Sequence, residues 1–154
     1  MNIAVLAGGN SPERNVSLAS GKAVASALAS RGHHVVTLDP ARGLEAVVDL
    51  AHIEIPAGPP SNEELASMPV ARYLDAISLP VWNSIDIAFS VLHGKNGEDG
   101  VMQALLQARG IRFTGSSVMG CSLTMDKAQT KIVFSAVGVP TPRWTLLVRS
   151  EELD

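Results

Sequence analysis

The sequence lacks the features that mark several classes of protein. It contains a single cysteine, Cys121, so no disulfide can form within the chain, as is usual in a reducing compartment. No apolar run approaches the roughly 20 residues that a membrane helix needs. The amino terminus has no basic stretch before a long apolar run, as a secretory signal would have. We therefore expect a cytoplasmic protein without a membrane partner.

The sequence also lacks a strong excess of charge. It has 12 Lys and Arg residues against 15 Asp and Glu residues, a net charge of -3, and basic residues occur at most in pairs. Nucleic-acid binding needs a basic patch, so we expect no nucleic-acid partner. With 154 residues, 46% hydrophobic and 18% charged, the composition is that of a globular protein with one domain and the beginning of a second.

The first 38 residues predict a strand, a helix and a second strand. A buried strand over residues 3–6 ends at Gly8-Gly9, and helical spacing of apolar residues follows from about 16 to 31. Gly32 stands where a helix cap is expected, and the next strand covers residues 35–38. Such a unit has parallel strands and a right-handed crossover.

Later segments continue the pattern less regularly. We expect short helices near 44–50, 62–66 and 71–76, strands at 85–91 and 111–114, helices at 101–109 and 123–137, and a strand starting at 144–148. The fold class is therefore α/β, an open, mostly parallel, Rossmann-like sheet with helices on both faces. The late strand opens a new pattern close to Asp154, which predicts a first domain over residues 1–118 and a truncated second one over 119–154.

The first glycine-rich loop, residues 8–17, follows the first strand, where open parallel sheets bind ligands. It lacks the Gly-x-Gly-x-x-Gly pattern of dinucleotide sites, and Glu13 would repel a pyrophosphate. A carboxylate there suits a ligand that carries an ammonium group. The alternative, an ordinary turn with Glu13 and Arg14 simply solvated, has about even weight.

The second loop, residues 93–100, places His93 and Glu98 around two glycines at the end of another strand. A functional role is favoured for His93 because it stands at the carboxyl end of a strand beside glycines. Its imidazole can donate a hydrogen bond to a carboxylate. Asp99 is better explained as a cap for the next helix. A metal site formed by His93 and Glu98 is an unfavoured alternative, because no third ligand stands at a recognisable spacing.

Two lysines, Lys127 and Lys131, lie four residues apart and so share one face of the predicted helix at 123–137. The alternative to a functional role is a solvated basic surface, and for Lys131 the solvated surface is favoured. Cys121 is interpreted as a packing residue without a chemical role.

In combination, these segments resemble the D-alanine–D-alanine ligases, and their joint order and spacing over nearly the whole chain make the match specific. The motifs are Val5-Leu6-Ala7-Gly8-Gly9-Asn10-Ser11-Pro12-Glu13-Arg14-Asn15-Val16-Ser17-Leu18, Val91-Leu92-His93-Gly94-Lys95-Asn96-Gly97-Glu98-Asp99-Gly100, Phe113-Thr114-Gly115-Ser116-Ser117-Val118, Met125-Asp126-Lys127-Ala128-Gln129-Thr130-Lys131 and Gly138-Val139-Pro140-Thr141-Pro142.

The resemblance implies an ATP-grasp ligase whose amino-terminal sheet is of the pre-ATP-grasp type. Such an enzyme uses ATP and Mg²⁺ (or Mn²⁺) to activate one D-alanine as an acyl phosphate, which the amine of a second D-alanine attacks. The product is the D-Ala-D-Ala dipeptide of peptidoglycan. The family also implies a homodimer formed through the amino-terminal domain.

The resemblance assigns roles to five residues of this sequence. Glu13 would bind the ammonium group of the first D-alanine, Val16 would pack near its methyl group, and His93 would lie beside its carboxylate. These assignments make Glu13 and His93 the catalytic pair. Glu98 would contact a mobile loop that closes over the site, and Lys127 would reach the phosphates of ATP.

The family's magnesium ligands, adenine pocket and closing loop are expected in later domains, so the 154-residue chain is expected to be inactive alone. A stand-alone module that binds a small amino acid without catalysis is the main alternative. A Rossmann-type oxidoreductase domain is disfavoured by Glu13 and the missing third glycine. The second substrate, D-alanine, D-lactate or D-serine, is left open.

Overall fold

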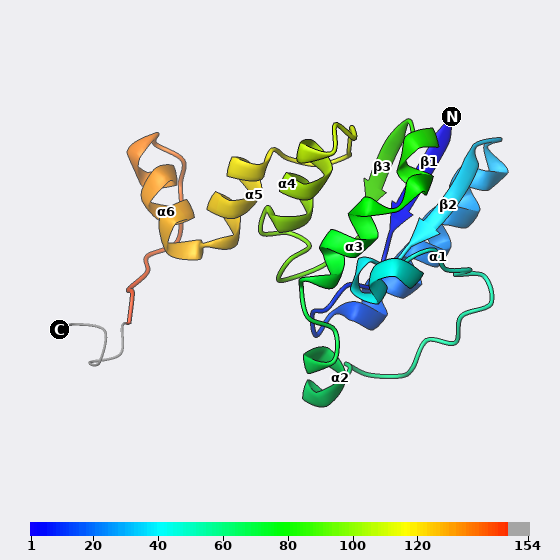
Figure 1. Ribbon diagram of the computed structural model, residues 1–154. Coiled ribbons are helices and arrows are strands. Elements are labelled where there is room, and N and C mark those ends of the chain that lie inside the picture. The colour runs from blue at the N-terminus through cyan, green and yellow to red at the C-terminus, as the bar shows by residue number, and fades with distance from the viewer. Residues whose placement is uncertain (148–154) are drawn as a thin grey trace.

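A three-stranded parallel sheet forms the centre of the protein in the computed structural model, which describes residues 1–147 (Figure 1). The strands are β1 (Asn2–Leu6), β2 (His34–Leu38) and β3 (Ile87–Ser90), in the order β2-β1-β3. This confirms the predicted α/β class and the parallel pairing of the first two strands. The predicted strand at 111–114 is reduced to one parallel bridge between Ala88 and Phe113.

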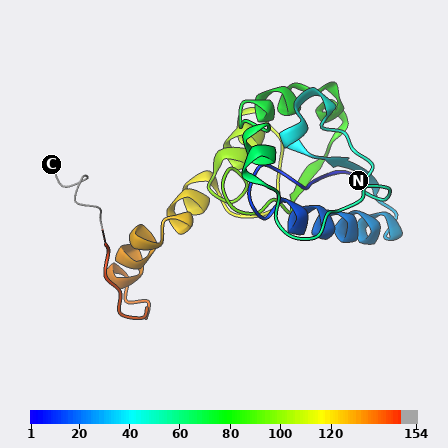
Figure 2. The same ribbon diagram turned by 90° about the horizontal axis from the view of Figure 1, so that it is seen from below.

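Helices cover both faces of the sheet because β1 is apolar on both sides. Helix α1 (Arg14–Ser30) packs on one face, where Leu18 contacts Ala7 and Leu50. Helices α3 (Arg72–Ser78) and α4 (Val101–Ala108) pack on the other face in a larger core. Its bulky members are Leu6, Leu38, Tyr73, Trp82, Leu92, Met102 and Leu106. Figure 2 shows α1 and α3 on opposite sides of the strands.

The predicted helix near 44–50 is wrong. The chain instead forms the short 3₁₀ helix η1 (Pro40–Glu45), which Asp39 begins by accepting a hydrogen bond from the Ala41 N–H. Within η1, Gly43 takes a φ of 62°, which kinks the helix at this residue. Val47 pairs antiparallel with Leu38, so this segment runs beside the edge strand β2.

The other short helices of this region are where the sequence predicts them. Helix α2 (Asn62–Ala66) begins with a capping box formed by Ser61 and Glu64, and α3 follows. A second 3₁₀ helix, η2 (Pro80–Ser84), places the Trp82 indole in the core, where it donates to the Ala76 carbonyl at 2.9 Å.

The single helix predicted at 123–137 is two helices, α5 (Val118–Met125) and α6 (Lys127–Ala136). The break is at Asp126, whose extended backbone and side chain start a new helix by accepting from the N–H groups of Ala128 and Gln129. Residues 144–147 form no strand, and the last residue of that prediction, Val148, lies outside the described residues.

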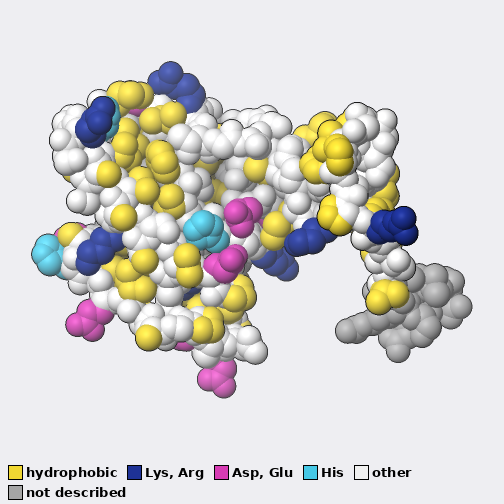
Figure 3. Space-filling view, turned by 180° about the vertical axis from the view of Figure 1, so that it is seen from behind, with side chains coloured by type: hydrophobic (Ala, Val, Ile, Leu, Met, Phe, Trp, Pro, Cys, Tyr) yellow, Lys and Arg dark blue, Asp and Glu magenta, His cyan; other side chains and the backbone are white. Residues whose placement is uncertain are grey.

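Helices α5 and α6 extend away from the sheet as an arm (Figures 1 and 2). Hydrophobic side chains lie at the surface of this arm (Figure 3), including Met119, Ile132 and Phe134. Among residues 1–147, no helix is both long and apolar enough to cross a membrane.

The topology fixes where a ligand site is expected. From β1 the chain passes through α1 to β2 on one side, whereas β3 lies on the other side of β1 and leads into α4. The strand order therefore reverses between β1 and β3, and the loops that leave these two strands lie at the edge of the sheet where a ligand crevice is expected.

Candidate functional site

The loop after β1 turns tightly, which explains its two glycines. Gly8 and Gly9 have φ values of 86° and 78°. A Cβ on Gly8 would come within 2.7 Å of the Asp39 carboxyl carbon, and one on Gly9 within 2.9 Å of the Tyr73 hydroxyl. Both glycines are therefore required by backbone conformation and by the close approach of a neighbour.

An ion pair beneath this turn holds it in place. Arg14 Nη2 lies 2.5 Å from Oδ2 of Asp39, whose side chain is 0% exposed. Arg14 Nη1 also donates to the Gly9 carbonyl at 2.7 Å, and Asp39 Oδ1 accepts from the Gly9 N–H at 3.0 Å. The alternative of a solvated Arg14 is therefore wrong, because its guanidinium joins the loop to the end of β2.

Glu13 stands at the start of α1 with its carboxylate turned towards the second loop. It occupies the N-cap position but makes no side-chain cap hydrogen bond. A Cβ on Gly94 would come within 2.9 Å of Glu13 Oε2, so the carboxylate lies against Gly94. The structure therefore brings Glu13 beside the residue that follows His93, where the loops after β1 and β3 meet.

His93 is partly accessible, with 33% of its side chain exposed, and its Nδ1 lies 3.9 Å from Glu98 Oε1. Glu98 Oε2 accepts from the Gly94 N–H at 2.6 Å, so this carboxylate also stabilises its own loop. Asp99 accepts from the Val101 N–H at 3.2 Å, consistent with the predicted role at the start of α4. Within residues 1–147, no group of three His, Cys, Asp or Glu side chains could hold a metal ion.

Val16 lies one turn along α1 from Glu13, with 60% of its surface exposed. Together they line a hollow of about 550 Å³ whose other wall is the segment of residues 55–59. That segment is held by Asn15, whose side-chain amide donates to the carbonyls of Pro56 and Gly58 at 3.2 and 2.8 Å. The structure therefore places Glu13 between this hollow and the loop that carries His93.

The structure does not bring Lys127 to this crevice, because it lies on α6 in the arm (Figure 1). It lines a separate small hollow of about 160 Å³ together with Lys131. Lys131 is not simply solvated, since its Nζ donates to Thr141 Oγ1 at 2.8 Å.

Sequence reasoning missed a set of polar residues between the two loops. Asn10 Oδ1 accepts from the Tyr73 hydroxyl at 3.0 Å and from Asn96 Nδ2 at 3.0 Å, and Ser11 and Ser17 are almost fully buried nearby. Asn96 has a φ of 65°, which an asparagine tolerates better than most residues. Asparagines within glycine-rich loops are a signal for such turns, but the sequence does not show that their side chains meet.

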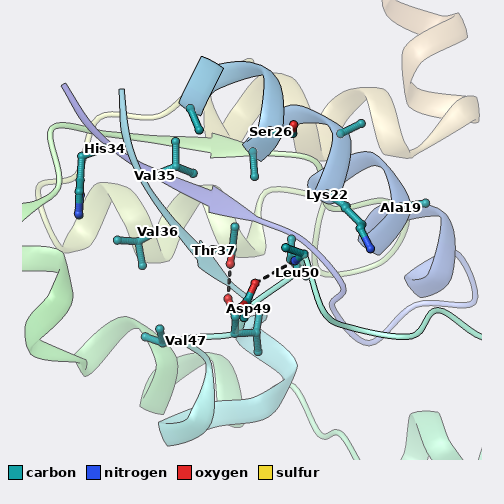
Figure 4. A pocket seen from close by; sticks show the side chains of 15 residues that line it. Ala19, Lys22, Ser26, His34, Val35, Val36, Thr37, Val47, Asp49 and Leu50 are labelled. Carbon is teal, nitrogen blue, oxygen red and sulfur yellow. Dashed lines mark hydrogen bonds between the residues drawn. The ribbon is translucent and has the colours of Figure 1, made fainter. Parts of the chain in front are cut away.

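A hollow of about 910 Å³ lies elsewhere (Figure 4). It lies between α1 and β2 and is lined mostly by small or apolar side chains such as Ala19, Val35 and Leu50. None of the residues predicted to act on a ligand lines it. The candidate site is therefore the place where the two polar loops meet, and not this hollow.

Comparison with known proteins points to one family. The family profile described as "D-ala D-ala ligase N-terminus" matches residues 2–116. A D-alanine–D-alanine ligase of Moorella thermoacetica is 40% identical over 148 residues, covering 94% of this chain and 38% of that protein.

Solved structures agree with this match. The structure of the Bacillus anthracis D-alanine–D-alanine ligase complexed with ATP has a TM-score of 0.65 and 29% identity, and the match covers 100% of this chain and 43% of that one. The ligase of Coxiella burnetii has a TM-score of 0.67 and 25% identity, covering 94% of this chain and 44% of that one. The chain spans about two fifths of the length of the curated relatives that it matches.

Proposed function

The chain belongs to the D-alanine–D-alanine ligase family, and on this premise we propose that it forms the D-alanine-binding, amino-terminal part of an ATP-dependent carbon–nitrogen ligase. The reaction is the joining of two D-alanines into the dipeptide used for peptidoglycan. The observation that carries the proposal is the contact of the Glu13 carboxylate with Gly94, because it joins the two predicted ligand loops in one crevice.

The chemistry of the crevice suits an amino acid with opposite charges at its two ends. Glu13 binds the ammonium group, and its carboxylate makes no capping hydrogen bond to the helix that it starts. His93, with a partly exposed imidazole, lies on the neighbouring loop and faces the carboxylate end. Val16 contributes apolar surface for the methyl group from the next turn of α1.

The nucleotide chemistry belongs to a different part of the proposal. We assign Lys127 to the phosphates of ATP, since its ammonium group is exposed beside Lys131 on the arm. Residues 1–147 offer no set of side chains that fits Mg²⁺, so we place the metal, and with it acyl phosphate formation, in the part of the ligase that the matched region does not cover.

Three further assignments complete the proposal. Glu98 contacts a loop that closes over the bound substrate, which its 52% exposed side chain allows. Residues 1–118 form the substrate domain and 119–154 begin the ATP-grasp domain. The protein is a cytoplasmic homodimer that associates through the substrate domain.

The test is a titration of the chain with D-alanine, followed by calorimetry or by amide chemical shifts. We expect weak binding with a roughly millimolar Kd, a binding free energy of about -4 kcal/mol. The chain contacts only one side of the substrate, so few interactions offset the cost of binding. Glu13→Gln keeps the size of the side chain and removes its charge, so it should abolish binding. Glu63→Gln, on the exposed face of α2, is the matched control and should leave binding unchanged.

Two results would count against the proposal. Equal binding by the wild type and Glu13→Gln would remove the role of the carboxylate. Submicromolar binding would show that the chain already holds a complete site, as expected for a stand-alone binding module.

A further inference from the structure

Two buried serines bridge the loop after β1 and the loop after β3 in the same way. Ser17 Oγ accepts from the Gly8 N–H at 2.9 Å and donates to the Val91 carbonyl at 2.6 Å. Ser11 Oγ accepts from the Glu13 N–H at 3.2 Å and donates to the His93 carbonyl at 2.7 Å. Each hydroxyl therefore uses its one proton and a lone pair to join backbone groups that are far apart in sequence.

The two bridges differ in what they join. The Ser17 hydroxyl joins Gly8 and Val91 and bonds to neither Glu13 nor His93, although the Ser17 N–H donates to the Glu13 carbonyl within α1. The Ser11 bridge joins the backbone of Glu13 directly to the backbone of His93. Ser11 is 1% exposed and its Cβ and Oγ also lie against Gly94, so water does not replace the hydroxyl easily.

We propose that Ser11 is a positioning residue for the amino-acid ligand, setting the separation between Glu13 and His93. This inference rests on the proposed function. An amino acid has its ammonium and carboxylate groups a fixed distance apart, so a site that binds both must hold its two contacts at a matching distance. Glu13 and His93 come from different loops. The Ser11 hydroxyl links their backbones, because it accepts from the Glu13 N–H and donates to the His93 carbonyl.

The test compares Ser11→Ala with Ser17→Ala, which remove the same group from equally buried positions. The ligands are D-alanine and propionate, which has the carboxylate and methyl group but no ammonium. Ser11→Ala should weaken D-alanine binding about tenfold and propionate binding little, so the preference for D-alanine falls. Ser17→Ala should lower the melting temperature to a similar extent while leaving that preference unchanged.

A loss of the D-alanine preference to the same extent in both variants, or in neither, would overturn the proposal. Ser11→Cys replaces the hydroxyl with a slightly larger thiol that forms weaker hydrogen bonds, and it provides a second variant if Ser11→Ala does not fold. It should give an intermediate preference, and a wild-type preference in this variant would count against the role of the hydroxyl.

Amide hydrogen exchange measured without ligand separates this inference from the proposed function. The Glu13 N–H should exchange faster in Ser11→Ala than in the wild type, and at the wild-type rate in Ser17→Ala. If the wild type binds no D-alanine, the proposed function fails, and the exchange rates alone decide whether Ser11 fixes Glu13. Unchanged exchange of the Glu13 N–H in Ser11→Ala would overturn the inference by itself.

Discussion

Ionisation of Tyr73 measures how completely its hydroxyl is buried beneath the loop that follows β1. Its side chain is 1% exposed, and its hydroxyl accepts from the Asn10 N–H at 3.2 Å while donating to Asn10 Oδ1 at 3.0 Å. Burial raises the pKa of Tyr73 from 10.0 to about 12, because the phenolate would lose its hydration. It is the only tyrosine in the sequence, so its titration can be observed without overlap from others.

The raised pKa makes stability depend on pH in a defined direction. The unfolded chain loses the phenol proton near its ordinary pKa of about 10, whereas the folded chain keeps it until about 12. The contribution of the neutral phenol is therefore complete below about pH 10 and is lost as the pH rises through about 12. Two pKa units correspond to about 3 kcal/mol of unfolding free energy.

Two measurements test this reasoning. The phenolate absorbance of the folded chain, followed against pH, should rise with a midpoint near 12. Urea unfolding at about pH 9 and about pH 11.5 should show a loss of stability in the wild type that exceeds the loss in Tyr73→Phe, by about 2 kcal/mol. A phenolate midpoint near 10 in the folded chain, or equal losses in both proteins, would refute the burial of this hydroxyl.

The other predictions concern the two close contacts around the loop and helix α1. Replacing Arg14 with Met leaves Asp39 buried without its partner, so the unfolding free energy measured in urea should fall by about 3–5 kcal/mol. The control is Arg31→Met, at the exposed end of the same helix, which should have little effect. Equal effects would show that the pair contributes nothing. A Cβ on Gly21 would come within 2.4 Å of the Ala7 Cβ, so Gly21→Ala should lower the unfolding free energy by about 1–3 kcal/mol. Adding Ala7→Gly should restore part of this loss in urea titrations. An unchanged stability of Gly21→Ala would show that α1 moves away from Ala7 without cost.

The sequence predicted the elements whose signal is local. The apolar run of β1, the spacing and Gly32 cap of α1, and the glycine that follows α4 all specify their structures within a few residues. The meeting of the two loops that were predicted to bind a ligand also followed from topology, because parallel strands end at one edge of the sheet.

The failures involve competition that a pattern does not reveal. Apolar residues at 44–50 fit a helix, but Gly43 and pairing with β2 favoured an extended segment. The spacing of apolar residues predicts one continuous helix over 123–137, but the Asp126 side chain caps a new helix and so divides it. The Ser11 bridge could not be predicted, because its partner at His93 is 82 residues away and specified only by the folded backbone.

The absence of a side-chain cap at the start of α1 has a consequence for sequence change at position 13. Ser, Asp or Asn there would reach the free amides of the first turn and make the helix more stable by about 0.5–2 kcal/mol. Each of these side chains is too short to extend to Gly94 as Glu13 does, and Ser and Asn carry no charge. Under the proposed function, selection for stability and selection for ligand binding oppose each other at this residue, and engineering that optimises helix caps should leave it unchanged.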